Sequence, residues 1–428
     1  MLTPMRKMLA RAGQSPFVRN VGILTSGTVF AQGLAVLALP VLTRLYTPEA
    51  FGLLSVYVAL MGFFASVATL RFDIAIPIPE QDDEAANLLA LALVIATGVA
   101  LALGLGAVLF PTQITAGLRQ DALLPYLWMV PLAVFGVASY NTLQSWSTRQ
   151  NRYGLVTRTR IRRAIGGTSV QLGLGVIGVG PIGLLAGQLL NAALGVTGLA
   201  RAIWRFDTDQ TSAISRQAMR AAFAKYRDFP ARLAPAAVLE AGYQFLPFLI
   251  LGPVIGAAEV GILYLTMRAM ALPVTLVGAS ISLVFLAGAT KRRQGGTLGV
   301  FTRRIMRHAF LVGAPAIAAI GGFGYLLGPW ILGAGYDFVQ EIVLWTVPWF
   351  VMQAVYTPVS TLFASTNRQS QWLGLHSLGF VMIVGGTFAA TRLAPDSAAI
   401  LFALANFAFY AFMVLALARL SYRIETRP

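Results

Sequence analysis

A single guanidinium interrupts a long apolar run: Arg268 is the only charged residue between positions 260 and 289. Polar side chains of this run share one helix face with the arginine, within about 40° on a helical wheel, and they are Tyr264, Arg268, Thr275 and Ser282. Pro273 interrupts this stripe along the chain, between Arg268 and Thr275, and because proline lacks an N–H we expect a local bend and an unpaired carbonyl one turn earlier. An arginine keeps its proton in proteins, so this stripe predicts a polar surface inside a helix bundle.

A second intramembrane charge is Glu240, which shares a face with Tyr243 and Gln244 by their i, i+3, i+4 spacing. At about 1.5 Å per residue, Glu240 lies roughly 10 Å from one face of a 30 Å hydrocarbon core and Arg268 roughly 12 Å from the other. Their levels then differ by less than about 10 Å. The two side chains could therefore form a buried ion pair, either a structural pair or one that opens during transport.

The elements that must position these residues are transmembrane helices. The chain has 428 residues, of which 57% are hydrophobic and 11% charged, and its mean hydropathy is +0.72; soluble domains carry roughly 25% charged residues. Windows of roughly 20 apolar residues, enough to cross a bilayer, occur twelve times, at 20–44, 50–71, 85–110, 123–146, 161–179, 181–204, 233–254, 258–289, 308–332, 341–364, 370–391 and 397–419. The sequence predicts an all-α integral membrane protein with about 12 transmembrane helices.

Several kinds of chemistry are excluded or disfavoured by composition. There is no cysteine, and two histidines, His308 and His376, cannot by themselves furnish a metal cage, so we expect no metal and no cofactor. The motif Asp207-Thr208-Asp209 imitates that of metal-dependent sugar transferases, but a loop of some thirty residues cannot supply a nucleotide-sugar domain. No constellation of nucleophile and general acid is visible, so the sequence does not predict an enzyme.

Positive charge is distributed very unevenly along the chain. The formal net charge is +16, and nearly all of the 32 Lys and Arg residues fall in alternate loops. This asymmetry predicts cytoplasmic amino and carboxyl termini, and it explains the charge through anionic membrane lipids, without nucleic acid. Tryptophans near span ends, including Trp146 and Trp204 at the inner ends, are typical of an aromatic belt.

The longest cytoplasmic loop divides the chain into two six-helix halves. We predict a cytoplasmic tail over 1–19, an N-terminal lobe over 20–205, a basic linker over 206–231, a C-terminal lobe over 232–420 and a tail over 421–428. In the linker, Arg216, Arg220 and Arg227 occupy one helical sector and Met219, Phe223 and Tyr226 a neighbouring one, which predicts an amphipathic surface helix. Scattered polar residues within spans favour a central, watery cavity between the lobes.

Two stretches near the amino terminus, SGTVFAQGLAVLALPVLTRLYTPEAFG (26–52) and LRFDIAIPIPEQDDEAANL (70–88), carry a family resemblance. The resemblance continues through QNRYGLVTRTRI, KYRDFP and GAAEVGILYLTMRAMALPVTLVGASISLVF, and covers most of residues 20–290. The chain resembles bacterial oligosaccharide flippases of the polysaccharide biosynthesis protein family, in the multidrug/oligosaccharidyl-lipid/polysaccharide exporter superfamily. Glu240 departs from the family pattern, which has a neutral polar residue there.

This resemblance implies that the chain moves undecaprenyl-diphosphate-linked oligosaccharide units across the bacterial inner membrane by alternating access. The units would serve O-antigen, capsule or exopolysaccharide synthesis, with other polysaccharide-assembly membrane proteins as further partners. Permanently charged, forked guanidinium groups suit a diphosphate. We therefore expect Arg268 to contact it, with Arg44 and Arg71 as weaker candidates at helix ends, Tyr264 and Thr275 lining the cavity, and Glu240 as an ion-pair partner or coupling residue.

Two other functions stay open at this point. One is a cation-coupled exporter of small molecules or drugs from the same superfamily, although such exporters usually favour acidic residues and Glu240 is the only mid-span carboxylate. The other is a membrane polysaccharide polymerase or ligase, which generally carries its reactive residues in a large outside loop. The longest outside loop predicted here is PTQITAGLRQDA, which is too short for a folded domain.

Overall fold

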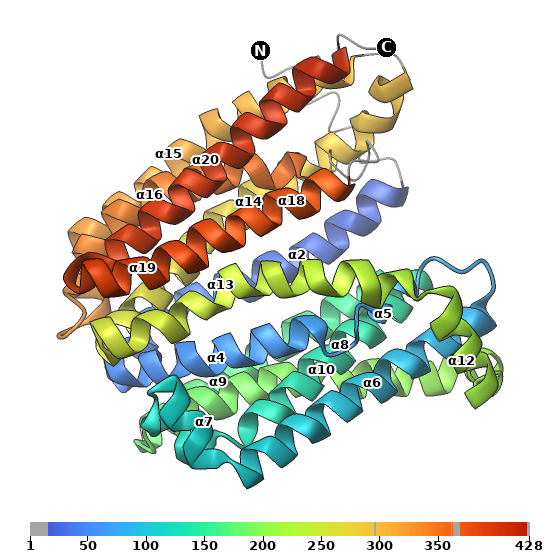
Figure 1. Ribbon diagram of the computed structural model, residues 1–428, viewed down its shortest axis with the longest axis horizontal. Helices are drawn as coiled ribbons and strands as arrows, with labels where there is room; N and C mark the ends of the chain where they lie inside the picture. Colours follow the sequence, from blue (N-terminus) through green and yellow to red (C-terminus); the bar gives the residue numbers. More distant parts are fainter. Residues whose placement is uncertain (1–15, 295–296, 361, 363–368, 426–428) are drawn as a thin grey trace. The chain divides into compact units, whose positions relative to one another are not determined.

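A computed structural model describes residues 16–294, 297–360, 362 and 369–425, and their regular structure is entirely helical. The predicted all-α class is therefore confirmed. Most of the predicted amino-terminal tail and the last three residues lie outside the described part. The long helices (Figure 1) are α2 (Pro16–Leu37), α4 (Pro48–Val67), α6 (Asp82–Leu109), α8 (Met129–Arg149), α9 (Tyr153–Ile177), α10 (Ile182–Phe206), α13 (Ala234–Ile255), α14 (Ala257–Gln294), α15 (Leu298–Leu332), α16 (Phe338–Tyr356) and α20 (Ala398–Glu425).

Shorter helices fill the connections: α3 (Leu39–Leu45), α5 (Phe72–Ala75), α7 (Pro111–Leu118), α11 (Thr208–Ser212), α12 (Arg216–Lys225), α18 (Gln369–Phe380) and α19 (Gly386–Leu393). Their ends follow local rules. Proline stands in the first turn of α3, α4 and α7, where a missing N–H costs nothing. Ser215 caps α12 by accepting a hydrogen bond from the Ala218 N–H, and Gly178 ends α9 in the left-handed conformation.

Within the described residues, nine helices are long and apolar enough to cross a membrane, and a tenth span is formed if α2 and α3, bent by 41° at their junction, are counted as one. The other two predicted spans correspond to α8 and α9. Both helices are long enough to cross a membrane, but their sequences are too polar to be counted among these spans. Helix α9 begins at Tyr153, eight residues before the predicted span 161–179. Arg158 and Arg160, which that window leaves in the preceding loop, therefore lie on the helix.

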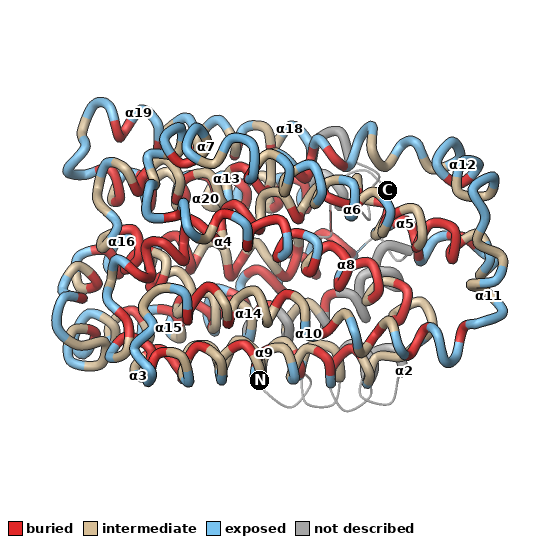
Figure 2. Tube along the Cα trace, turned by 90° about the horizontal axis from the view of Figure 1, so that it is seen from below, coloured by how far each residue is buried: buried red, intermediate tan, exposed pale blue. Residues whose placement is uncertain are grey.

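The chain forms two compact units, one of residues 37–261 and one of residues 1–36 with 262–428. In the first, α4 packs on α8 and α13, α6 on α8, and α10 on α8 and α9. In the second, α15, α16 and α20 pack on one another. Helix α4 is buried along most of its length, whereas the second half of α6 is largely exposed (Figure 2). The predicted lobes and their linker boundary stay a prediction.

Helices α4 and α14 approach each other closely at their first turns, within the 37–261 unit. A Cβ on Gly52 would overlap the carbonyl oxygen of Ala257, and one on Gly261 would overlap the carbonyl oxygen of Pro48. Only glycine permits backbones to come this close, as is common where membrane helices cross.

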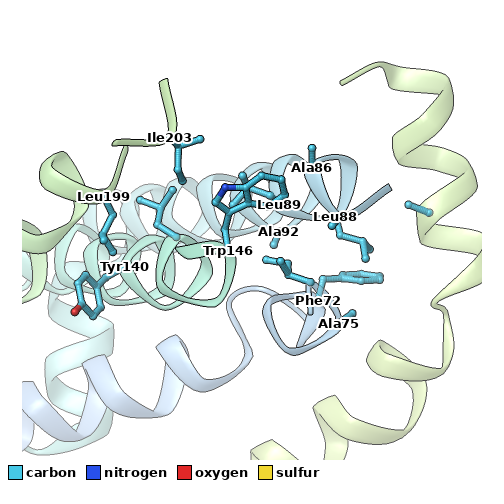
Figure 3. Close-up of a cluster of buried hydrophobic side chains, with 14 residues drawn as sticks. Phe72, Ala75, Ala86, Leu88, Leu89, Ala92, Tyr140, Trp146, Leu199 and Ile203 are labelled. Carbon is cyan, nitrogen blue, oxygen red and sulfur yellow. The ribbon is translucent and has the colours of Figure 1, made fainter. Parts of the chain in front are cut away.

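A hydrophobic cluster lies within the same unit. It joins α5, α6, α8, α10 and α12, and Figure 3 shows Phe72, Leu88, Trp146, Leu199 and Ile203 among its members, all buried. The Trp146 ring is fully buried. The prediction that Trp146 belongs to an aromatic belt is therefore wrong, because this indole finds both apolar packing and a hydrogen-bond partner inside the bundle.

Candidate functional site

Arg268 lies on α14, half-buried, and its Nη1 donates a hydrogen bond of 3.4 Å to the Tyr264 hydroxyl one turn earlier. Among the described residues of its own compact unit, no carboxylate forms an ion pair with it. The spacing of four residues places both side chains on one helix face, as the sequence predicts. The guanidinium has thus a neutral hydrogen-bond partner and keeps donors for an anion.

Two further members of the stripe lie beyond Pro273. Thr275 is half-buried and its hydroxyl donates to the carbonyl oxygen of Ala271 at 2.8 Å, which leaves the hydroxyl oxygen available as an acceptor. Ser282 is also half-buried. Helix α14 continues through Pro273, and the bend expected there stays a prediction. The stripe therefore presents a cation and hydroxyl groups along one helix.

Arg71 stands at an unusual backbone corner between α4 and α5. Leu70 and Arg71 both adopt left-handed conformations, with φ of 48° and 65°, which cost a non-glycine residue on the order of 1–3 kcal/mol each. The Arg71 Nη1 donates a long hydrogen bond of 3.5 Å to the carbonyl oxygen of Ser66, and its Nε is buried without a partner in the described chain. This corner holds a guanidinium whose hydrogen-bonding capacity is only partly used.

Glu240 is half-buried on α13, and Arg71 is close enough for its charge to act on the Glu240 carboxyl. Both residues belong to the 37–261 unit, as does Arg44, whose exposed guanidinium donates to the carbonyl oxygen of Pro40 at 2.6 Å near the end of α3. Arg268 belongs to the other unit. The candidate residues thus form two sets, and the predicted pairing of Glu240 with Arg268 stays a prediction.

A further arginine of the 37–261 unit is Arg163 on α9, which falls within the predicted span 161–179. Its Nε donates to the carbonyl oxygen of Asn191 on α10 at 2.5 Å, the Asn191 amide donates back to the Arg163 carbonyl at 3.2 Å, and its guanidinium lies 3.8 Å from the Tyr140 ring centroid. Gly195 makes room, because a Cβ there would overlap the Tyr140 ring. All partners come from distant positions, so no local pattern could have revealed them.

Asp207 holds three helix ends together. Its carboxylate is buried and accepts hydrogen bonds from the Trp146 Nε1 at 2.9 Å and from both terminal nitrogens of Arg152 at 2.7 and 2.5 Å. Such a forked arginine–carboxylate pair is among the strongest hydrogen-bonded contacts in proteins. The Asp207-Thr208-Asp209 motif thus has a structural role through Asp207. No cluster of three potential metal ligands occurs in the described residues.

A bundle of apolar helices that contains isolated arginines defines the chain as a multi-pass membrane protein. A sequence model of the family described as "Polysaccharide biosynthesis protein" matches residues 41–340, and the chain belongs to this family. Among curated proteins, none matches the sequence significantly.

Solved structures of several transporters share this fold. The inward closed form of the lipid II flippase MurJ has a TM-score of 0.69 at 13% identity, with 93% of this chain and 90% of that chain covered. An inward-facing multidrug resistance MATE family transporter of the MOP superfamily has a TM-score of 0.63 at 14% identity, with 96% of each chain covered. The eukaryotic MATE transporter AtDTX14 has a TM-score of 0.59 at 12% identity, with 96% and 98% covered. At such identities the likeness shows the fold.

Proposed function

We propose that this protein is a flippase that moves undecaprenyl-diphosphate-linked oligosaccharide units from the inner to the outer leaflet of the bacterial inner membrane. The observation that carries the proposal is Arg268, a guanidinium within a membrane helix that has a tyrosine partner and forms no ion pair with a carboxylate among the described residues of its own unit. The family match and the exporter-superfamily fold support it.

A diphosphate concentrates negative charge and offers several acceptor oxygens, which matches the fork of an arginine. Arg268 supplies the cation, Tyr264 fixes its orientation through the 3.4 Å hydrogen bond, and Thr275 adds a hydroxyl to the same stripe. Arg71, whose buried Nε has no partner among the described residues, and Arg44 are the weaker candidates for contact with the diphosphate. Translocation breaks no covalent bond, so the site needs charge and hydrogen bonds rather than a nucleophile.

The orientation belongs to the same proposal. The arginine distribution supports cytoplasmic amino and carboxyl termini, so that basic loops concentrate anionic lipid headgroups at the inner mouth of the transporter. Exported units would pass to other membrane proteins of polysaccharide assembly. Glu240 has one of two roles: it neutralises an arginine between transport cycles, or it couples transport to protons.

The test is Arg268→Ala in a strain that lacks the native gene. We expect export of full-length surface polysaccharide to fall roughly tenfold or more, because a charge-assisted hydrogen bond contributes about 1.5–3 kcal/mol. Arg392→Ala, which removes an exposed arginine from α19, is the matched control and should export normally. Normal export by stably expressed Arg268→Ala protein would contradict the proposal.

A second candidate, export of drugs or other small molecules, is favoured by the likeness to MATE transporters. Overexpression separates the two: resistance to cationic dyes without any effect on polysaccharide would support the drug exporter. A deletion strain separates the flippase from a polymerase or ligase, because lipid-linked units should accumulate on the cytoplasmic side if transport is lost and on the outer side if polymerisation is lost.

A further inference from the structure

Four exposed arginines lie on the helix pair α9–α10, in addition to those described above. Arg158 and Arg162 are four residues apart on α9, and Arg201 and Arg205 are four residues apart on α10. Because residues at i and i+4 share a helix face, each helix presents two guanidinium groups on the same side. We call these four residues the α9–α10 arginine patch.

The two arginine pairs lie at the same end of this helix pair. Helices α9 and α10 are consecutive and antiparallel, and the Cβ position of Gly198 lies 3.4 Å from the Thr159 methyl group. At about 1.5 Å per residue, Arg158 and Arg162 lie roughly 8 and 14 Å from the start of α9, and Arg201 and Arg205 roughly 8 and 2 Å from the end of α10. The patch therefore occupies the last few turns at one end.

Helix α9 directs its arginines to two sides. Arg163 is bound to Asn191, and Arg160 donates to the Gln144 side chain at 3.1 Å, so both find partners within the unit. Arg158 and Arg162 instead follow the exposed stripe that continues with Ile165 further along α9. These two guanidinium groups thus stand on the surface that the helix turns away from its packing partners.

No acidic side chain in the described part of the chain forms an ion pair with the patch. The nearby carboxylate of Asp207 is already engaged by Arg152 and Trp146. Trp204 stands beside Arg205 with 80% of its surface exposed, as is typical of a side chain at the boundary between hydrocarbon and headgroups. The patch is therefore cationic and has no ion-pair partner in the described part of the chain, and the exposed Trp204 supports a position near the headgroups.

We infer that the α9–α10 arginine patch binds the phosphate groups of anionic phospholipids in the leaflet at this end of the pair, which is the inner leaflet in the proposed orientation. A guanidinium on a lipid-facing surface is costly unless it reaches the headgroup layer or a counterion. A phosphodiester supplies that counterion with the acceptor geometry that arginine prefers. The site is separate from Arg268 and does not depend on the proposed transport activity.

The test measures how strongly the full-length protein, purified in zwitterionic detergent, retains fluorescent phosphatidylglycerol compared with fluorescent phosphatidylcholine. We expect the wild type to prefer phosphatidylglycerol. In the variant R158Q/R162Q/R201Q/R205Q this preference should fall at least about tenfold, since each basic residue near the surface adds to the attraction of anionic lipid. The variant R216Q/R220Q/R227Q/R232Q removes the same charge from exposed arginines in and beside α12 and should keep most of the preference.

Equal losses in both quadruple variants, or no loss in the patch variant, would overturn the inference. Because four changes at once can disturb folding, the pairs R158Q/R162Q and R201Q/R205Q are measured separately, and each should lose part of the preference at an unchanged melting temperature. A competition arm adds polyprenyl diphosphate. If this lipid, rather than phosphatidylglycerol, is the one whose retention depends on the patch, the assignment to phospholipid is wrong, and a substrate entry site takes its place.

Discussion

At the scale of single residues, two arginines within membrane helices have opposite surroundings. Arg163 is bound to Asn191 and covers the Tyr140 ring, so its charge is satisfied by the protein. Arg268 has a neutral tyrosine and a helix face with hydroxyl groups. An intramembrane charge is a sign of function only where the protein leaves it partly unsatisfied, and this contrast makes Arg268 the better candidate for an anion site.

Arg163→Met should therefore destabilise the protein without a direct effect on substrate binding. The change removes a charge-assisted hydrogen bond and a cation–π contact, and we expect about 2–4 kcal/mol of lost stability. Thermal unfolding in detergent measures the effect. Arg162→Met, one residue away and exposed, should change the melting temperature little; similar shifts for both variants would show that Arg163 is not specially held.

The sequence predicted the polar stripe around Arg268 correctly because helical periodicity is a local property. It could not predict that Arg163 meets Asn191, or that Arg71 stands at a left-handed corner near Glu240, because these contacts join residues far apart in the chain. Hydropathy alone penalises a charge whatever its partner, so the predicted span over α9 begins only at residue 161. The family resemblance indicated the candidate positions, but it did not indicate which residues contact them.

At the scale of elements, α12 is docked rather than free. Asn87 near the start of α6 donates to the Ala213 carbonyl at 3.2 Å and accepts from the Ser215 N–H at 3.1 Å, just before α12 begins. Lys225 at its other end pairs with Glu84, which raises the pKa of the Lys225 ammonium, and the Phe223 ring lies 5.5 Å from that of Phe72. The amphipathic pattern predicted the helix, but not the surface on which it packs.

Asn87→Ala should release this helix. The change removes two hydrogen bonds to the chain that leads into α12, and we expect trypsin to cleave at the arginines of α12 several-fold faster under native conditions. Gel electrophoresis of timed digests gives the rate. Asn141→Ala, an exposed asparagine on α8, is the control. An unchanged cleavage rate in Asn87→Ala would show that other contacts suffice to hold α12.

The crossing of α4 and α14 depends on glycine. Gly52→Ala places a methyl group against the Ala257 carbonyl, and backbone atoms cannot rotate away as a side chain could. We expect strongly reduced yield of folded protein or a loss of at least about 2 kcal/mol of stability. Gly98→Ala on the exposed face of α6, where a Cβ meets nothing, should be neutral or slightly stabilising. Normal yield and stability of the Gly52→Ala protein would contradict this account of the crossing.

At the scale of the whole molecule, Glu240 and Arg268 lie in different compact units. If they pair, as their predicted depths suggest, the pair would close and open as the units move. Glu240→Arg combined with Arg268→Glu should then restore the folding lost in either single variant while transport stays low, because the diphosphate would meet a misplaced cation. Folding yield and polysaccharide export are measured together. Failure of the double variant to rescue folding would argue against the pair.

The sequence predicts the class of the fold and the positions of its helices better than it predicts which helices pack together. Composition and hydropathy indicated a helical membrane protein, and each predicted span corresponds to a helix or a bent pair of helices among the described residues, although α8 and α9 are more polar than ordinary spans. The sequence could not predict which helices pack on one another, because apolar windows have similar sequences whichever helix they contact. The pairing of α13 with α4 across the central linker is an example.

Helix α9 also bears on how the chain enters the membrane during synthesis. On its own it is a weak membrane segment, because several arginines lie in its first three turns, and the partner of Arg163 is made only later, on α10. The Arg152–Asp207 ion pair then joins the two ends of this hairpin. We therefore expect α9 to wait at the translocation channel until α10 has been synthesised, and the two helices to be inserted together as one hairpin.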